Sequence, residues 1–305
     1  MSAAYYIPNI YTKCVADFTF LNNPKSHIWV VAAPRRANRP NEAEKHLTEC
    51  PFCDGGEAEH QLVYQIGEKD DWLVRVVYNK YPFATVHEVV IHGQDHLKSF
   101  AELSAPHLEA LFHAFQHRYN EHAHRGQVII FHNHGALAGE SLPHPHSQIA
   151  VIPERVHIDA PELRSVLPQE SVYRFEQELF SLLAPKISQW PDEVWIVPKT
   201  KGKTFGQMTD AERKELSYLM KQLILIFDHR YNRDFPFNFY IYPGEHWYLR
   251  LIPRIKSLGG FELATGVYVN TQKPEETMTF IRKHLHTPDL EKILQEDQAE
   301  YHRTM

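Results

Sequence analysis

The sequence lacks three features that would point to a membrane, a secretion route or nucleic acid. No apolar run approaches the roughly 18 residues that a membrane helix needs. The first residues, MSAAYYIPNIYTKC, contain no basic start followed by an apolar core, so they do not resemble a signal peptide. The formal net charge is -6 at pH 7, whereas a general nucleic-acid binder usually carries a basic face. We therefore expect a cytoplasmic protein that binds neither membranes nor nucleic acid.

Cysteine is also scarce: the chain has 3, and this odd count is unlike a disulfide framework. Cys50 and Cys53 form a CxxC pair, which in a cytosolic protein usually binds metal or performs redox chemistry. The pair does not open a strong helix after a strand, which disfavours the redox interpretation. Two thiolates at this spacing can share a tetrahedral zinc ion with two histidines from elsewhere, and we favour this over two unpaired thiols. Cys14 is a weaker candidate for a third ligand.

The common nucleotide-binding and zinc-protease motifs are absent as well. No GxGxxG follows a predicted strand, and no HExxH occurs. The GKT at 202–204 lacks the first glycine of a P-loop, because Val197 stands at that position. A nucleotide site built on these motifs is therefore excluded.

The chain is long enough to bury a sizeable core. Its 305 residues, 43% of them hydrophobic, fit one large domain or two of about 150 residues. Apolar residues at helical spacing after Ser104 predict a helix over 105–119. Short runs rich in β-branched and aromatic residues predict strands at 27–34, 72–79, 87–93, 127–135 and 147–153.

The second half repeats the order of the first. The tetrapeptide HRYN occurs at 117–120 and again at 229–232, and a strand ending in Ile-Pro follows each copy. The repeat is too long for a solenoid, so we predict a duplicated fold. The second copy of the histidine-rich loop keeps only His246, which predicts a single reaction centre. The predicted boundaries are domains at 1–168 and 169–305, a connector at 160–171 and a C-terminal helix over 287–305.

The most distinctive stretch reads SLPHPHSQIAVIP and covers residues 141–153. Its histidines, His144 and His146, flank a proline. The same spacing recurs at His122/His124, His132/His134 and His284/His286 in a chain with 21 His. Spacing alone therefore does not separate a reactive loop from a turn with solvated imidazoles.

The context of this loop favours chemistry. Gly135 and Gly139 upstream permit turns and close approach to an anion, and a hydroxyl follows them at Ser141. Alternation along a strand places His144 and His146 on one face, so one imidazole can bind a metal while the other stays free as a nucleophile. A phosphate also needs cations, and forked contacts could come from the arginines of PRRANRP, namely Arg35, Arg36 and Arg39.

With these residues assembled, the chain resembles the galactose-1-phosphate uridylyltransferases, a branch of the histidine-triad superfamily. The resemblance implies an α+β fold of two tandem histidine-triad-like halves, each an antiparallel sheet with a covering helix. It covers most of the chain in the family's order and rests on the segments WVVAAPRRANRP, CPFCDGGE, VVYNKYPF, HEVVIHGQDH, NHGALAGESLPHPHSQ and GGFELATGVYVN.

The resemblance also implies a double-displacement reaction. His146 would attack the α-phosphorus of a nucleotide sugar, hexose 1-phosphate would leave, and a second sugar phosphate would take the nucleotide from His146. Gln148 matches the family's glutamine that holds the transferring phosphate, where hydrolytic relatives have a third histidine. A neutral amide donates hydrogen bonds but does not deliver a proton or activate water, so we expect a transferase rather than a hydrolase.

Other residues match the family's binding positions. The predicted nucleotide- and phosphate-binding residues are Arg36, Arg39, Asn79, Asn133 and Ser141. The predicted sugar-binding residues are Lys256, Phe261 and Glu262. The predicted zinc ligands are Cys50, Cys53, His96 and His144. Such a zinc ion would be structural, but His144 would tie it to the reactive loop.

Two departures from the family leave alternatives open. Some members hold a second metal partly through an H-x-H near the end of the second half, where this chain has Arg250 and Ile252, so we expect no second metal. Glu140 replaces the small residue common before the loop serine, which leaves the base and the sugar open. The alternatives are a nucleotide-sugar phosphorylase that uses inorganic phosphate, a hydrolase, and a non-catalytic nucleotide-binding or scaffold protein. The expected partners are a nucleotide sugar and a hexose 1-phosphate, and a homodimer is compatible with them.

Overall fold

The computed structural model describes residues 4–6, 18–22, 28–39, 50–53, 56, 61–96, 99–163, 172–231 and 234–286. Cys14, the predicted domain boundary and the predicted C-terminal helix lie outside these residues, as does most of the predicted connector. Within the described ranges, no helix combines the length and the apolar character that crossing a membrane requires.

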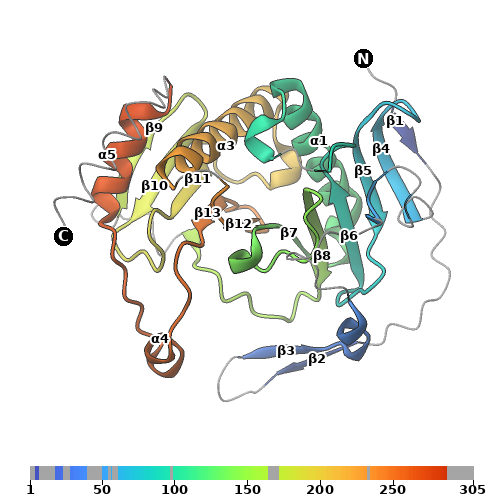
Figure 1. The fold of residues 1–305 in the computed structure, drawn as a ribbon, viewed down its shortest axis with the longest axis horizontal. Helices are drawn as coiled ribbons and strands as arrows, with labels where there is room; N and C mark the ends of the chain where they lie inside the picture. The colour runs from blue at the N-terminus through green and yellow to red at the C-terminus, as the bar shows by residue number, and fades with distance from the viewer. Residues whose placement is uncertain are drawn as a thin grey trace.

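An 11-stranded sheet forms the body of the molecule (Figure 1), and all of its neighbouring strands pair antiparallel. The strands of the first half are β1 (Ala4–Tyr6), β4 (Leu62–Gly67), β5 (Trp72–Tyr78), β6 (Val86–Ile91), β7 (Gln127–His134) and β8 (His146–Ile152). Those of the second half are β9 (Val172–Glu176), β10 (Phe180–Pro185), β11 (Val194–Pro198), β12 (Phe237–Ile241) and β13 (Leu249–Pro253).

The order of the strands confirms the predicted pair of similar halves. Apart from β1 at the outer edge of the first half, each half runs through three sheet strands, a long helix and two strands, with α1 (Ala105–His122) before β7 and α3 (Asp210–Arg230) before β12. Across the sheet, β4-β5-β6-β8-β7 is followed by its mirror order β12-β13-β11-β10-β9. The two predicted sheets are joined into one, because β7 pairs with β12 from His134 opposite Phe237 to Ile130 opposite Ile241.

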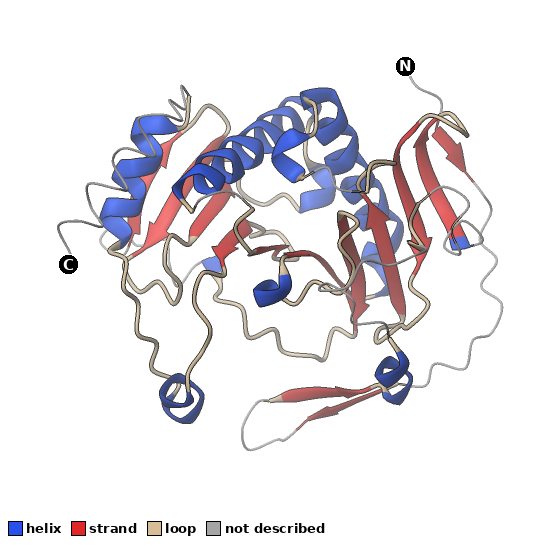
Figure 2. Cartoon of the chain, viewed as in Figure 1, coloured by secondary structure: helices blue, strands red, loops and turns tan. Residues whose placement is uncertain are grey.

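Both long helices begin where the sequence supplies a cap. The Ser104 hydroxyl accepts a hydrogen bond from the His107 N–H at 3.4 Å, and α1 starts at the next residue. Thr209 and Glu212 form a capping box before α3. The two helices lie along the top of Figure 2, where they cover one face of the sheet.

Alternation along the strands decides which side chains face these helices. One face carries the apolar residues of the main core, including Val128 and Ile130 of β7, Ile149 and Val151 of β8, and Phe237 and Phe239 of β12. The opposite face carries His146, Gln148, Asn133 and Asn238, since neighbouring residues of a strand point to opposite faces. The polar residues predicted for the reaction therefore lie on the face without long helices.

Two arms project at the bottom of Figure 1, away from α1 and α3. One is a hairpin of β2 (Thr19–Asn22) and β3 (Trp29–Ala32), which leads into the 3-10 helix η1 (Pro34–Asn38). The other carries the short helix α4 (Gly260–Thr265). The last described helix, α5 (Pro274–His284), packs against β9 and β10.

Candidate active site and metal centre

The predicted nucleophile follows a tight loop between β7 and β8. Gly135 and Gly139 take positive φ angles of 80° and 81° on either side of the 3-10 helix η5 (Ala136–Ala138). His146 is 5% exposed, and its Nδ1 lies 2.8 Å from the His144 carbonyl oxygen. Nδ1–H therefore donates to that carbonyl, and Nε2 keeps its lone pair. Burial lowers the pKa of His146 to about 4, so the imidazole is neutral near pH 7.

Gln148 is held by a buried histidine that the sequence did not single out. The Phe83 backbone N–H donates to Nδ1 of His87 at 3.3 Å, so the ring hydrogen of His87 resides on Nε2. Nε2 of His87 lies 3.0 Å from Oε1 of Gln148, to which it donates. Burial lowers the pKa of His87 to about 3, which keeps this arrangement uncharged. The amide nitrogen of Gln148 is thereby left to donate to a ligand.

The loop that follows β5 wraps around His87. Nδ2 of Asn79 lies 3.2 Å from Nε2 of His87, and Oδ1 of Asn79 accepts from the Tyr81 N–H at 2.8 Å. Phe83 packs on His87 with ring centroids 4.2 Å apart. Asn79 therefore lies beside His87, which in turn contacts Gln148, and its role at the transferring phosphate stays a prediction.

Two arginines reach the site of Asn79 and Ser141: Arg36 in η1 and Arg39 directly after it. Arg36 donates to the Tyr81 carbonyl at 2.7 Å and stacks over Phe83, and Arg39 donates to the Ser141 hydroxyl. Neither guanidinium has an ion pair with a carboxylate of the described residues. Burial, with the charge of Arg39 second, lowers the pKa of Arg36 to about 10. Two cations that have no counter-ion among the described residues and lie beside a Ser hydroxyl form a suitable anion site.

The predicted zinc ligands come together although they are far apart in sequence. Cys50, Cys53, His96 and His144 each offer one ligand atom within 4.8 Å of the others. The Nδ1 atom of His144 lies 3.6 Å from the Cys50 sulfur and 3.5 Å from the Cys53 sulfur. Nδ1 of His96 lies 3.4 Å from the Cys53 sulfur.

These separations fit a tetrahedral ion. With usual zinc–sulfur and zinc–nitrogen lengths, the edge between a sulfur and a nitrogen ligand is about 3.5 Å. His144 is also oriented for ligation, because its Nε2–H donates to the Gly93 carbonyl at 2.9 Å and leaves Nδ1 for the metal. The four residues can therefore hold zinc, and His144 places that centre two residues from His146.

Phe52 links the CxxC turn to the predicted nucleophile. Its ring centroid lies 5.2 Å from that of His146 and 6.1 Å from that of His144. Phe52 also packs on the small apolar cluster of Trp72, Val77, Val89 and Ile91. The ring therefore shields one side of His146 from water, a contact that CxxC alone does not reveal.

The second half supports the reactive loop through Asn238 of β12. Its amide nitrogen donates to Oδ1 of Asn133 at 2.8 Å and to the Ala138 carbonyl at 2.9 Å. Asn133 lies beside His146, because the preceding pair in the register is His132 opposite Ser147. The sequence offered no local signal for Asn238, since this contact joins strands of different halves.

The predicted sugar-binding residues are not brought to His146 within the described chain. Lys256 and Glu262 form an ion pair of 3.1 Å with each other, and Phe261 is 56% exposed. All three belong to the arm of α4, which lies apart from β8 in Figure 1.

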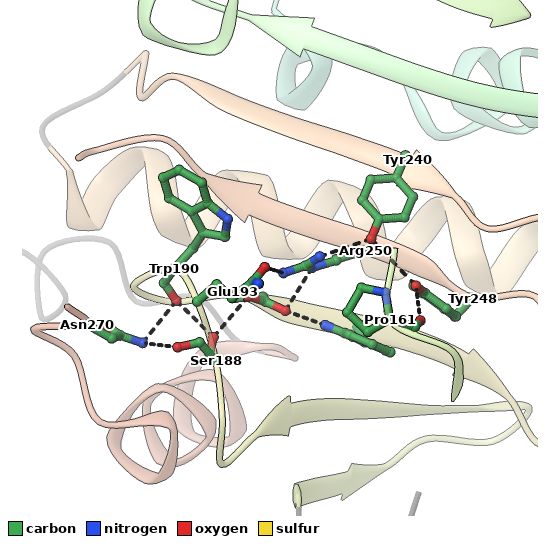
Figure 3. Close-up of polar contacts among 10 residues, drawn as sticks. Pro161, Ser188, Trp190, Glu193, Tyr240, Tyr248, Arg250 and Asn270 are labelled. Atoms are coloured by element: carbon green, nitrogen blue, oxygen red, sulfur yellow. Dashed lines mark hydrogen bonds and ion pairs between the residues drawn. The ribbon is translucent and has the colours of Figure 1, made fainter. Parts of the chain in front are cut away.

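The counterpart of the reactive face in the second half is filled by a buried network (Figure 3). Arg250 of β13 forms a 2.8 Å ion pair with Glu193 and donates to the Tyr240 hydroxyl at 3.0 Å. Glu193 also accepts from the Trp195 indole N–H at 2.6 Å. Burial alone would lower the pKa of Arg250, but the Glu193 carboxylate raises it above its usual value. This network has no free nucleophile, and the absence of a second metal stays a prediction.

Comparison with known proteins places these features in a family. Residues 116–292, more than half of the chain, match the family described as "Galactose-1-phosphate uridyl transferase, C-terminal domain". The chain belongs to this family. Residues 35–154 also match the "Domain of unknown function (DUF4931) N-terminal domain". The resemblance that the sequence motifs carried is thereby confirmed.

Relatives of this uridyl transferase family include two kinds of enzyme. The chain is 26% identical to the ADP-glucose phosphorylase of Arabidopsis thaliana, over 86% of this chain and 91% of that one. It is 26% identical to the galactose-1-phosphate uridylyltransferase of Thermotoga maritima, over 86% of this chain and 96% of that one. The crystal structure of the A. thaliana ADP-glucose phosphorylase with bound ADP-glucose superimposes with a TM-score of 0.69, covering 88% of this chain and 99% of that one. The fold and a relation to nucleotidyl-transfer enzymes follow, whereas the substrate does not.

Proposed function

We propose that the protein is a nucleotidyltransferase that moves a nucleoside monophosphate, UMP in our prediction, between a nucleotide sugar and a hexose 1-phosphate. The observation that carries this proposal is the pairing of His146 and Gln148 on one face of β8. His146 is neutral and has Nδ1 fixed by the His144 carbonyl, and Gln148 has its oxygen fixed by His87. One side chain is thus ready to attack phosphorus, and the other is ready to donate to a phosphate oxygen.

The reaction takes two displacements at one phosphorus. In the first, the lone pair of His146 Nε2 forms a bond to the α-phosphorus, and the bond to the sugar-phosphate oxygen breaks with its electron pair. In the second, an oxygen of the acceptor phosphate attacks the same phosphorus, and the nitrogen–phosphorus bond returns its electrons to His146. Arg36, Arg39 and Ser141 would bind the phosphate oxygens in both steps.

Gln148 supports transfer over hydrolysis. Its amide can neither give a proton to a leaving group nor take one from water. His87 behind it does not supply one either, because burial keeps that ring neutral near pH 7. Phe52 covers the imidazole of His146 from one side. The nucleotidyl-histidine would therefore persist until a phosphate acceptor arrives.

Zinc is the metal that we propose for the Cys50, Cys53, His96 and His144 centre. When bound, it supplies a rigid tie between the CxxC turn and the reactive loop, with no part in bond making. His144 acts on the chemistry through its own carbonyl, which holds Nδ1 of His146.

A second candidate is a nucleotide-sugar phosphorylase that uses inorganic phosphate as the acceptor. The similarity to the ADP-glucose phosphorylase of A. thaliana over 86% of the chain favours it. The proposed chemistry at His146 is the same for both candidates, and they differ in the base and in the acceptor. A cytoplasmic location stays a prediction for either.

A homodimer is the assembly that we propose. Both arms carry exposed apolar side chains, with Leu21 and Val30 at 52% and 55% and Leu263 at 73%. A two-stranded hairpin such as β2–β3 is at best marginally stable alone, so a covering surface would stabilise it. Light scattering that gives the mass of one chain at micromolar concentration would contradict this assembly.

Intact-mass measurement tests the proposed function. The protein is incubated with UDP-glucose, ADP-glucose or a GDP-sugar, and the mass of one added nucleoside monophosphate identifies both the reaction and the base. Glucose 1-phosphate, galactose 1-phosphate or inorganic phosphate is then added, and loss of the adduct identifies the acceptor. No adduct with any donor, or steady release of nucleoside monophosphate without an acceptor, would contradict the proposal.

A further inference from the structure

Arg254, directly after β13, is a cation that has no counter-ion among the described residues. No carboxylate of the described residues forms an ion pair with it, and its buried Nε atom has no hydrogen-bond partner. Burial lowers the pKa of Arg254, and no anion offsets that effect. Arg250, which lies within β13, shows the contrast, because Glu193 forms an ion pair with it at 2.8 Å. A half-buried guanidinium that lacks such a partner is suited to bind an anion from outside the chain.

Two contacts hold Arg254 in place. Nη1 of Arg254 donates to Oδ1 of Asn238 at 2.8 Å, and the guanidinium carbon lies 4.4 Å from the ring centroid of Trp190. Trp190 is itself fixed, because its carbonyl accepts from Ser188 at 2.9 Å and from Asn270 at 3.3 Å (Figure 3). The Arg254 side chain is therefore held by the Trp190 ring and the Asn238 amide rather than by a carboxylate.

Asn238 connects Arg254 to the reactive loop. It donates to Asn133 at 2.8 Å, and Asn133 lies beside His146 in the register of β7 and β8. Since neighbouring strands are about 4.8 Å apart, Asn238 lies roughly 10 Å from His146 along the sheet. Arg39, directly after η1, contacts the loop at Ser141, whereas Arg254 belongs to the second half and is linked to the loop through Asn238.

We propose that Arg254 binds the phosphate group of the acceptor, and the same phosphate when it departs on the sugar, on the Asn133–Asn238 side of His146. This inference rests on the proposed function and names the subsite that its second substrate uses. The ligand class is a phosphate monoester or inorganic phosphate. Forked contacts from a planar guanidinium suit such a group better than the point charge of a lysine.

The test separates labelling of the enzyme from its discharge. Labelling uses a nucleoside 5′-phosphorimidazolide, whose leaving group carries no phosphate, and discharge uses glucose 1-phosphate or inorganic phosphate. In Arg254→Met, we expect labelling within about twofold of wild type. The half-saturating acceptor concentration should rise about 10- to 100-fold, the range expected when a charged hydrogen bond is lost. Arg254→Lys should give a smaller rise.

Lys273→Met is the matched control, because it removes one positive charge from an exposed side chain near α5. If Arg254→Met and Lys273→Met have the same half-saturating acceptor concentration, the proposal is overturned. A proportional loss of labelling and discharge in Arg254→Met also overturns it, since the residue would then act on the whole loop. If the wild type takes no label, the proposed function fails. The binding of inorganic phosphate is then measured by calorimetry. Loss of binding in Arg254→Met supports the subsite, and binding equal to that of the wild type overturns it.

Discussion

Replacing His87 with leucine would remove the hydrogen bond that orients the Gln148 amide. Gln148 is 4% exposed, so its Oε1 atom cannot exchange the 3.0 Å bond from His87 for a water molecule. An unmet buried acceptor costs about 1–3 kcal/mol. If the amide serves the transition state only in its present orientation, the labelling rate should fall by about 5- to 150-fold.

Two further variants of His87 separate orientation from packing. A glutamine at this position can place its amide donor near the site of Nε2, whereas an asparagine matches only the Nδ1 acceptor. We therefore expect His87→Gln to keep most of the rate and His87→Asn to behave like His87→Leu. Val86→Ala is the control for general loss of stability, because Val86 belongs to the main core on the opposite face of β6.

The assay is single-turnover formation of the nucleotidyl adduct, quenched at short times and read by intact mass. The donor concentration is varied, so that weaker binding is distinguished from a slower chemical step. We expect the maximal rate to fall while the half-saturating donor concentration stays within about threefold. A folded His87→Leu protein that labels at the wild-type rate would refute the positioning role of His87.

Four other predictions follow from the same site. His146→Ala should take no label from a nucleotide sugar by intact mass, and a surviving adduct would remove His146 as the nucleophile. Gln148→His should transfer more slowly and release free nucleoside monophosphate measurably, so undetectable release would count against the role of the neutral amide. Cys50→Ser with Cys53→Ser should lose the one zinc per chain in metal analysis and melt at a lower temperature; a wild type without zinc would contradict the site. The pKa of His87 is about 3 in the folded protein and about 6.5 in the unfolded chain, so the unfolded chain binds the proton first as the pH falls. The free energy of unfolding, measured by urea denaturation, should therefore fall by up to about 1.4 kcal/mol per pH unit below pH 6.5. His87→Gln should lose that part of the slope, and an unchanged slope would contradict the assignment.

Local patterns made part of this structure predictable. Alternating or continuous apolar runs gave β5, β6, β7 and β8 within a residue or two, and the Ser104 cap gave the start of α1. The Cys50, Cys53, His96 and His144 cluster, which could hold a metal, was predictable because the family resemblance supplied the two histidines that complete the CxxC pair. The internal repeat around HRYN predicted the duplicated halves, and the strand order confirms them.

The remaining features depend on contacts that no local pattern contains. Strands β9 and β10 carry polar and apolar residues without a clear period, and they were not singled out. Nothing in the local sequence distinguishes His87 from other strand residues, because its contact with Gln148 lies 61 positions away. Asn238 reaches Asn133 across 105 positions. Residues of this kind are selected by tertiary neighbours, so a single sequence gives them no distinctive signal.

The duplication explains how the second half contributes to the candidate site. Strand β7 carries Asn133, and without β12 its outer edge would present unpaired N–H and C=O groups. Pairing with β12 closes that edge and places Asn238 against both Asn133 and the Ala138 carbonyl of the loop. The buried Arg250–Glu193 pair then makes the second half a fixed support, since breaking such a pair costs about 3–5 kcal/mol. The first half alone would therefore keep His146 and the metal ligands but lose the contact that fixes Asn133 beside them.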